Sequence, residues 1–143
     1  MGWRDNRYTL GPKGEDMGYR VVDPYAVDKQ GHPEREAKSR RLSEPGGLET
    51  TSINQFEAEP GEQLPLAYHV HEQQQEAFYV IEGRLQFETP DGYHHVSAGE
   101  LFVADAGSPH RAENPPDADG PAVALAIGAP PADDVSPYQP DRE

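Results

Sequence analysis

Residues 69–83 of this chain read HVHEQQQEAFYVIEG. Two histidines, His69 and His71, stand two positions apart, and four polar residues separate them from Glu76. On a β-strand, residues two apart point to the same face about 6.5 to 7 Å from each other, so their imidazoles can converge on one ion through metal–nitrogen bonds of about 2.0 to 2.1 Å. A return strand can then bring the Glu76 carboxylate back beside both rings. The stretch therefore predicts two antiparallel strands that carry part of a metal site.

A third imidazole is expected from His110. It follows a predicted apolar strand over 100–104 and a tight loop, Gly107-Ser108-Pro109. Three neutral imidazoles and one carboxylate suit Fe, Mn, Zn or Ni, and also Cu, better than Mg or Ca. An octahedral ion with four protein ligands keeps two positions for water, a chelating substrate or dioxygen. We therefore predict one divalent transition metal (Fe, Mn, Zn or Ni) with the ligands His69, His71, Glu76 and His110.

On both sides of this stretch, short apolar runs are separated by turn residues, as at Glu59-Pro60-Gly61 and Pro90-Asp91-Gly92. Short runs with a period of two predict β-strands. The expected strands cover 51–58, 64–70, 77–81, 85–87, 93–96, 100–104 and 122–127. Many short strands between Gly and Pro turns indicate an all-β sandwich or barrel.

The flanks of this region have a different character. A short helix is predicted over 32–42, because Pro33 suits a first turn, acidic residues stand near the start and basic residues near the end. The basic cluster Arg35, Lys38, Arg40 and Arg41 is then expected to form the solvated face of this helix. The last residues are rich in proline, which predicts a loose terminus or an edge cover. The predicted organisation is an N-terminal arm with a short helix over 1–48, a barrel over 49–128 and a Pro/Asp-rich tail over 129–143.

Composition narrows the classes of function. A chain of 143 residues fits one domain, and the absence of cysteine excludes disulfides, thiolate ligands and a cysteine nucleophile. The net charge of -14 argues against nucleic acid and anionic membranes as partners, because both repel such a surface. No apolar run approaches the roughly 20 residues of a membrane span, and the first residues lack the apolar stretch of a signal peptide. We expect a cytoplasmic protein.

The balance of basic residues suggests adaptation to salt. Only three lysines accompany nine arginines, against 26 acidic residues. An acidic, lysine-poor surface is typical of halophilic proteins, whose self-repulsion is screened at high salt. The alternative is an ordinary acidic protein.

At the residues quoted above, the chain resembles the cupin superfamily. The stretch 69–83 is similar to the family's His-x-His, four spacers, Glu, six spacers, Gly, and GELFVADAGSPHRAEN (residues 99–114) is similar to its second motif. Two departures are Asp105, where the family usually has proline, and seven rather than five residues between Gly61 and His69. The resemblance covers about residues 50 to 127 and implies a small jelly-roll barrel, the double-stranded β-helix, with a metal in its interior. It also implies a homodimer, and positive φ angles at Gly83, Gly99 and Gly107.

Three functions are compatible with this pattern. The first is an enzyme in which the ion binds a small oxygen-bearing molecule, in the manner of a dioxygenase. The second is a non-catalytic module that binds a small ligand or metal. The third is a sugar or keto-acid isomerase with His94 or His95 as general base; these adjacent residues point to opposite faces of a strand, and we predict that neither is a ligand. The alternative to all three is a metal-free barrel, which would have to bury three imidazoles and a carboxylate without an ion.

Overall fold

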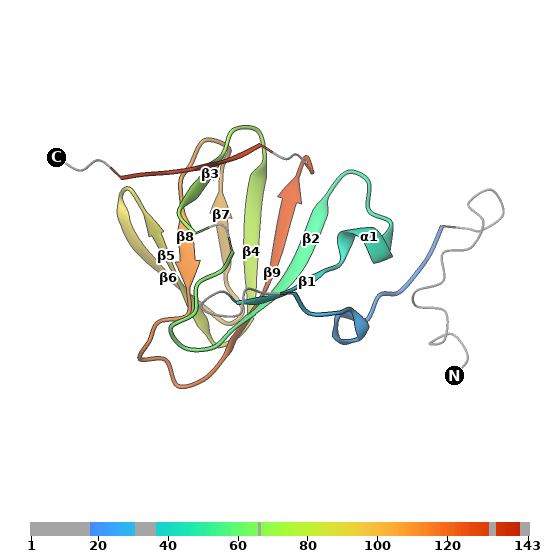
Figure 1. The fold of residues 1–143 in the computed structure, drawn as a ribbon, viewed down its shortest axis with the longest axis horizontal. Helices are drawn as coiled ribbons and strands as arrows, with labels where there is room; N and C mark the ends of the chain where they lie inside the picture. The colour runs from blue at the N-terminus through green and yellow to red at the C-terminus, as the bar shows by residue number, and fades with distance from the viewer. Residues whose placement is uncertain (1–17, 31–36, 66, 132–133, 141–143) are drawn as a thin grey trace.

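The computed structural model describes residues 18–30, 37–65, 67–131 and 134–140. Among these residues, strands dominate, and they form two packed layers (Figure 1). The first layer is a five-stranded sheet in the order β1 (Lys38–Arg41), β2 (Ser52–Ala58), β9 (Ala122–Ala129), β4 (Gln75–Glu82) and β7 (Leu101–Ala104). All neighbouring strands of this sheet are antiparallel.

The second layer is built from two smaller sheets. One has the order β6 (Gly92–Ser97), β5 (Arg84–Thr89) and β8 (Arg111–Glu113), and the other pairs β10 (Val135–Pro137) with β3 (His69–His71). Backbone hydrogen bonds between His69 and His110, of 2.9 and 3.1 Å, place β3 next to the start of β8. The strands that carry the two histidine motifs therefore lie side by side.

An aromatic core joins the two layers. Phe78 and Val80 alternate on β4 with the exposed Tyr79 and Ile81, so β4 presents one face to the core and the other to solvent. The ring of Phe78 lies 5.1 Å from that of Phe87 on β5, and Phe87 stacks on Phe102 at 4.0 Å. Phe78, Val80 and Phe87 thus belong to the buried core, and the partly buried Phe102 packs against it.

The predicted all-β architecture is confirmed, and most predicted strands are present. The strand expected over 64–70 begins only at His69, and the short strands β1, β8 and β10 were not predicted. The three glycines at which positive φ was expected, Gly83, Gly99 and Gly107, have φ angles of 73°, 89° and 83°. The strand β10 pairs with β3, so part of the tail covers a sheet edge rather than hanging free.

The position predicted for the short helix, residues 32–42, was wrong. Residues 31–36 lie outside the described part of the chain, while Lys38–Arg41 form a strand that pairs with β2, and the short helix α1 (Ser43–Gly46) follows it. Arg40 was expected on a solvated face but is buried: its guanidinium donates to Glu57 at 3.1 Å and to the Val27 carbonyl at 3.1 Å. It also stacks over the ring of Tyr25, in the 3-10 helix η2 (Pro24–Ala26). These contacts with distant residues outweigh the local helical signals.

None of the helices in the described ranges is long and apolar enough to cross a membrane.

Candidate metal centre

The four predicted ligands lie on three neighbouring parts of the barrel. His69 and His71 are the first and last residues of β3 and both are buried, while Val70 between them faces the other way. Glu76 is the second residue of β4, and His110 directly precedes β8. The turn between β3 and β4 returns the chain, so the Glu76 carboxylate comes back beside the imidazoles as the motif predicted.

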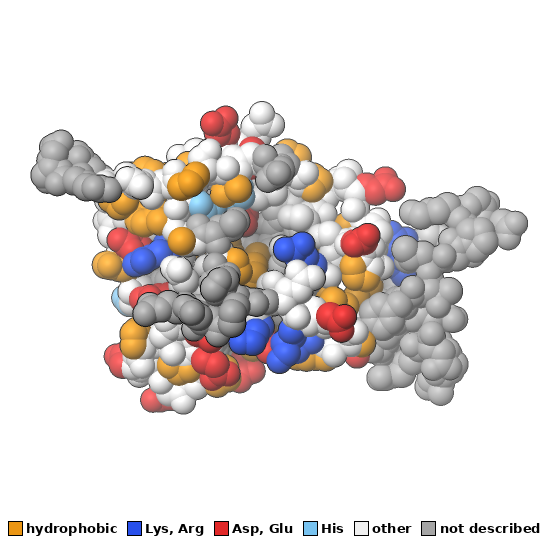
Figure 2. Space-filling model, in the orientation of Figure 1, with side chains coloured by type: hydrophobic (Ala, Val, Ile, Leu, Met, Phe, Trp, Pro, Cys, Tyr) orange, Lys and Arg blue, Asp and Glu red, His pale blue; other side chains and the backbone are white. Residues whose placement is uncertain are grey.

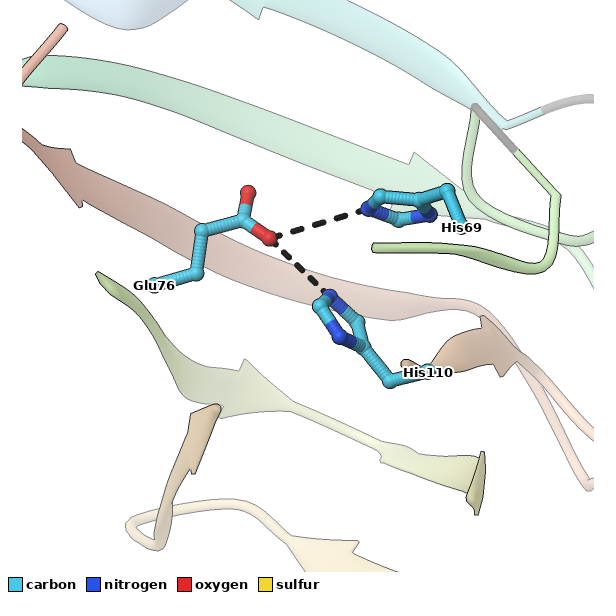
Figure 3. Close-up of side chains that lie close together, drawn as sticks. All are labelled: His69, Glu76 and His110. Atoms are coloured by element: carbon cyan, nitrogen blue, oxygen red, sulfur yellow. Dashed lines mark hydrogen bonds and ion pairs between the residues drawn. The ribbon is translucent and has the colours of Figure 1, made fainter. Parts of the chain in front are cut away.

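All three imidazoles face one carboxylate oxygen. The Nε2 atoms of His110, His71 and His69 lie 3.0, 3.3 and 3.8 Å from Glu76 Oε1. Figure 3 shows Glu76 pointing at the rings of His69 and His110, with which it forms a group whose ligand atoms all lie within 4.8 Å of one another. His71 lies outside this three-residue group, but its Nε2 atom lies near Glu76 Oε1. The structure thus brings together all four residues that the sequence singled out.

The outer nitrogens fix the state of the rings. His69 Nδ1 lies 3.0 Å from the Ala67 carbonyl, His110 Nδ1 lies 3.0 Å from the Ser108 carbonyl, and His71 Nδ1 lies 3.1 Å from Asp134 Oδ1. These oxygens are acceptors, so each neutral ring donates from Nδ1 and keeps its lone pair on Nε2. The three lone pairs then face a carboxylate oxygen.

Such an arrangement needs positive charge at its centre. Lone pairs and a carboxylate repel one another unless protons or a cation lie between them. The Nε2 atom of His71 is buried and makes no hydrogen bond within the described ranges. Neutral imidazoles held through Nδ1, together with a carboxylate, are the donor set that divalent transition metals take. The residues present therefore fit such an ion.

The carboxylate is ionised in this environment. Burial raises the pKa of Glu76, but hydrogen bonds that His110 and His69 donate when Nε2 carries a proton, and the charges of His110 and His71 in their protonated form, act against burial and lower the pKa to about 2. An ionised carboxylate is the form that binds a cation. Glu76 therefore needs no proton removed near neutral pH to act as a ligand.

Asp134 is a residue of the site that the sequence did not reveal. Its Oδ1 accepts from His71 Nδ1 at 3.1 Å, and its Oδ2 accepts from the backbone N–H of Gln73 and Gln74 at 2.5 and 3.0 Å. The hydrogen bond from Gln73 holds the pKa of Asp134 below its usual value against the opposing effect of burial, and the bonds from His71 and Gln74 act in the same direction. Asp134 comes from the proline-rich tail, where no local pattern marks a residue that meets a strand so far back in the chain.

A small cavity opens beside the cluster. It has a volume of about 80 Å³, and His69, Glu76 and His110 form part of its wall. The rest of its lining is mostly apolar, with Phe56, Leu64, Phe78 and Ala112, and includes one amide, Asn54. In the space-filling view, histidine side chains are partly visible among apolar ones beside β3 (Figure 2). The cluster thus adjoins a space that a small molecule can enter.

The two remaining histidines of the barrel lie elsewhere. His94 and His95 on β6 are both exposed, and neither lines this cavity. The ring of His94 lies 5.8 Å from that of Phe102, a core residue. Neither residue belongs to the cluster around Glu76.

Known proteins share this architecture. The structure is similar to that of an uncharacterized conserved protein with a double-stranded beta-helix domain from Klebsiella pneumoniae, with a TM-score of 0.67 and 22% identity over 85% of this chain and 98% of that one. It is similar to the polyketide cyclase RemF from Streptomyces resistomycificus, with a TM-score of 0.70 and 22% identity over 87% of this chain and 88% of that one. A sugar phosphate isomerase from a cupin superfamily, from Silicibacter pomeroyi, gives a TM-score of 0.62 and 25% identity over 75% of this chain and 73% of that one.

The family assignment rests on the sequence of the barrel. No curated protein matches the chain. The model of the Cupin_2 family, described as a cupin domain, matches residues 54–128, which is more than half of the chain. This match spans both histidine motifs and the strands that bring them together. The protein therefore belongs to the cupin family.

Proposed function

We propose that this cupin binds one divalent transition metal (Fe, Mn, Zn or Ni) through His69, His71, Glu76 and His110, and that it binds or converts a small oxygen-bearing molecule there, in the manner of a dioxygenase. The observation that carries the proposal is the convergence of three Nε2 atoms on Glu76 Oε1, at 3.0, 3.3 and 3.8 Å. Three neutral imidazoles with one carboxylate leave positions open on an octahedral ion.

The chain's own residues supply orientation and shelter. Ala67, Ser108 and Asp134 accept from the Nδ1 atoms and so aim each Nε2 at the centre. The apolar wall beside the cluster limits access of water to a bound molecule. The ion itself would supply Lewis-acid chemistry and, in the case of Fe or Mn, redox chemistry.

Metal binding is tested first, by elemental analysis of the purified protein and of His69→Ala. We expect about one metal per chain in the wild type and little in the variant. The matched control is His95→Ala, which removes an exposed histidine of β6 and should leave the metal content unchanged. Equal metal content in His69→Ala and the wild type would contradict the assignment of the metal site.

Catalysis is tested separately from binding. The protein is depleted of metal, reconstituted anaerobically with Fe²⁺, Mn²⁺, Ni²⁺ or Zn²⁺, and mixed with small oxygen-bearing compounds in an oxygen electrode. Oxygen uptake that depends on both metal and compound supports the oxygenase. Tight binding of a compound without turnover in any metal form favours the non-catalytic binding module instead.

A further inference from the structure

We infer that the ligand of the proposed metal site is a small chelator that carries at most one negative charge and, beyond its metal-binding end, an apolar body and a neutral hydrogen-bonding group that meets Asn54. This inference rests on the proposed function and names the class of its ligand. Three features support it: the charge of the metal site, the size and lining of the cavity, and the Asn54 amide, which has no hydrogen-bond partner among the described residues.

The charge of the site sets the charge of the ligand. Among the described residues, Glu76 is the one carboxylate that lines the cavity, and no Lys or Arg lines it, so a divalent ion with three neutral imidazoles and Glu76 carries a net charge of +1. The carboxylate of Asp134, hydrogen-bonded to His71 on the side away from the ion, offsets part of this positive charge. Arg111 stands between two lining residues in the sequence, but its guanidinium pairs with Glu88 at 2.5 Å. A neutral or singly charged ligand is therefore compatible with the site, whereas a dianion would leave uncompensated negative charge in an apolar surrounding, which is costly.

The size and walls of the cavity limit the body of the ligand. The cavity is small, with a volume of about 80 Å³. The walls away from the metal ligands are formed mainly by Phe56, Leu64, Phe78 and Ala112. A compact apolar segment fits such walls, whereas a doubly charged phosphate group fits neither the apolar lining nor the charge of the site.

The far end of the ligand is defined by Asn54. This residue lies on β2, across the barrel from β3, and its register partner Ala126 belongs to the core, so its side chain points inward. The Asn54 carboxamide makes no hydrogen bond with another described residue. An amide offers both donors and an acceptor, so a neutral hydroxyl, amide or carbonyl of the ligand satisfies it.

Two hydroxamates of equal size test the role of Asn54. Butyrohydroxamate and 3-hydroxypropionohydroxamate share the same singly charged bidentate head and differ by a terminal methyl or hydroxyl. Their dissociation constants are measured by calorimetry on Ni²⁺-loaded wild type, Asn54→Leu and Ser52→Ala, with Ni²⁺ content determined in each. We expect Asn54→Leu to lower the preference for the hydroxyl compound about 3- to 10-fold, which is the effect of one lost hydrogen bond. Ser52→Ala changes the same strand outside the cavity lining and should leave the preference unchanged.

A third probe tests the charge. Malonomonohydroxamate has the same head but ends in a carboxylate, and we expect it to bind at least about 10-fold more weakly than the hydroxyl compound. If Asn54→Leu retains Ni²⁺ and its preference for the hydroxyl compound is unchanged, this inference alone is overturned. It is also overturned if the Ni²⁺-loaded wild type binds the carboxylate compound most tightly. Failure of the wild type to retain Ni²⁺ or any other tested metal overturns the proposed function and this inference with it.

Discussion

The three imidazoles of the site are oriented by different kinds of acceptor. His69 and His110 each donate to a backbone carbonyl two residues earlier, so their own strands and turns set their orientation. His71 instead donates to the carboxylate of Asp134, a residue of the C-terminal tail. Because this acceptor is a side chain, its removal separates orientation from ligation, and it also removes the acceptor of the turn N–H groups of Gln73 and Gln74.

Replacing Asp134 by alanine should weaken metal binding without abolishing it. The change removes the acceptor of His71 Nδ1, and the loss of such a partner typically lowers metal affinity about 10- to 100-fold. A competition titration with a coloured chelator measures the affinity. Asp105→Ala is the matched control, since Asp105 is exposed and its carboxylate accepts only from Gln75 among the described residues. Equal affinities for both variants would contradict the role of Asp134.

Asn114, the last residue of the second histidine motif, has a structural role. It is fully buried, and its Nδ2 donates to the carbonyls of Ala58 and Gly120, both at 2.9 Å. We expect Asn114→Ala to lower the free energy of unfolding by about 2 to 4 kcal/mol, because the buried Ala58 carbonyl and the partly buried Gly120 carbonyl lose their donor. Urea unfolding measures the change, and the folded variant should keep its metal. A loss below about 1 kcal/mol would show that water replaces both bonds.

At the scale of elements, the turn after β4 fixes how the two layers meet. β4 belongs to the five-stranded sheet and β5 to the opposite layer, and Gly83 is the single residue between them. Its φ of 73° lies in the left-handed region, and a Cβ there would lie 2.4 Å from the Pro121 carbonyl oxygen. The crossing therefore requires glycine for both backbone conformation and space.

Two glycine substitutions separate these requirements. Gly61 also has positive φ, at 90°, but a Cβ there would meet nothing within 4 Å. Gly61→Ala should cost about 1 to 2 kcal/mol from the left-handed backbone alone. Gly83→Ala should cost about 2 to 5 kcal/mol, because the clash adds about 1 to 3 kcal/mol. Denaturant midpoints compare the two variants, and equal losses would show that the Pro121 segment moves freely aside.

At the scale of the whole molecule, charge and exposed apolar surface act in opposite directions. The net charge of -14 repels other copies and also strains the folded chain. Yet the outer face of β4 and β7 exposes four large apolar side chains: Tyr79, Ile81, Leu101 and Val103. Stability measured against salt concentration tests the effect of the net charge, and the oligomeric state tests the effect of the exposed apolar face.

The halophilic character stays a prediction, which unfolding against salt can check. Screening of like charges should raise the urea midpoint as KCl increases from 0.1 to 2 M, because the Debye length falls from about 10 Å to about 3 Å or less over this range. Most of the gain should come at the lower concentrations, where screening changes fastest. A midpoint that stays constant or falls would identify an ordinary acidic protein.

The homodimer also stays a prediction, and the outer face of β4 and β7 is where we expect it to form. Tyr79 pairs with Leu101 in register, so their side chains form a continuous apolar surface without a charged residue between them. Two copies can meet there without placing like charges in contact. Sedimentation should give a dimer for the wild type and a monomer for Leu101→Glu. Tyr93→Glu is the control, because Tyr93 is an equally exposed large apolar residue on β6, outside this face. A monomeric wild type would refute the prediction.

The sequence by itself determined the features that depend on near neighbours. The apolar period of two predicted the main strands, and the glycines predicted the turns. The spacing of His69, His71 and Glu76 predicted that the chain reverses over four residues and brings the three side chains together. The tertiary structure alone decided the placement of Arg40 and the contacts of Asp134 and Asn54. Local charges suggested a helix around Arg40, but pairing with β2 and burial against η2 made a strand. Asp134 reaches the site from the residue before β10 and Asn54 from β2, and these placements leave no periodic signal in the residues beside them.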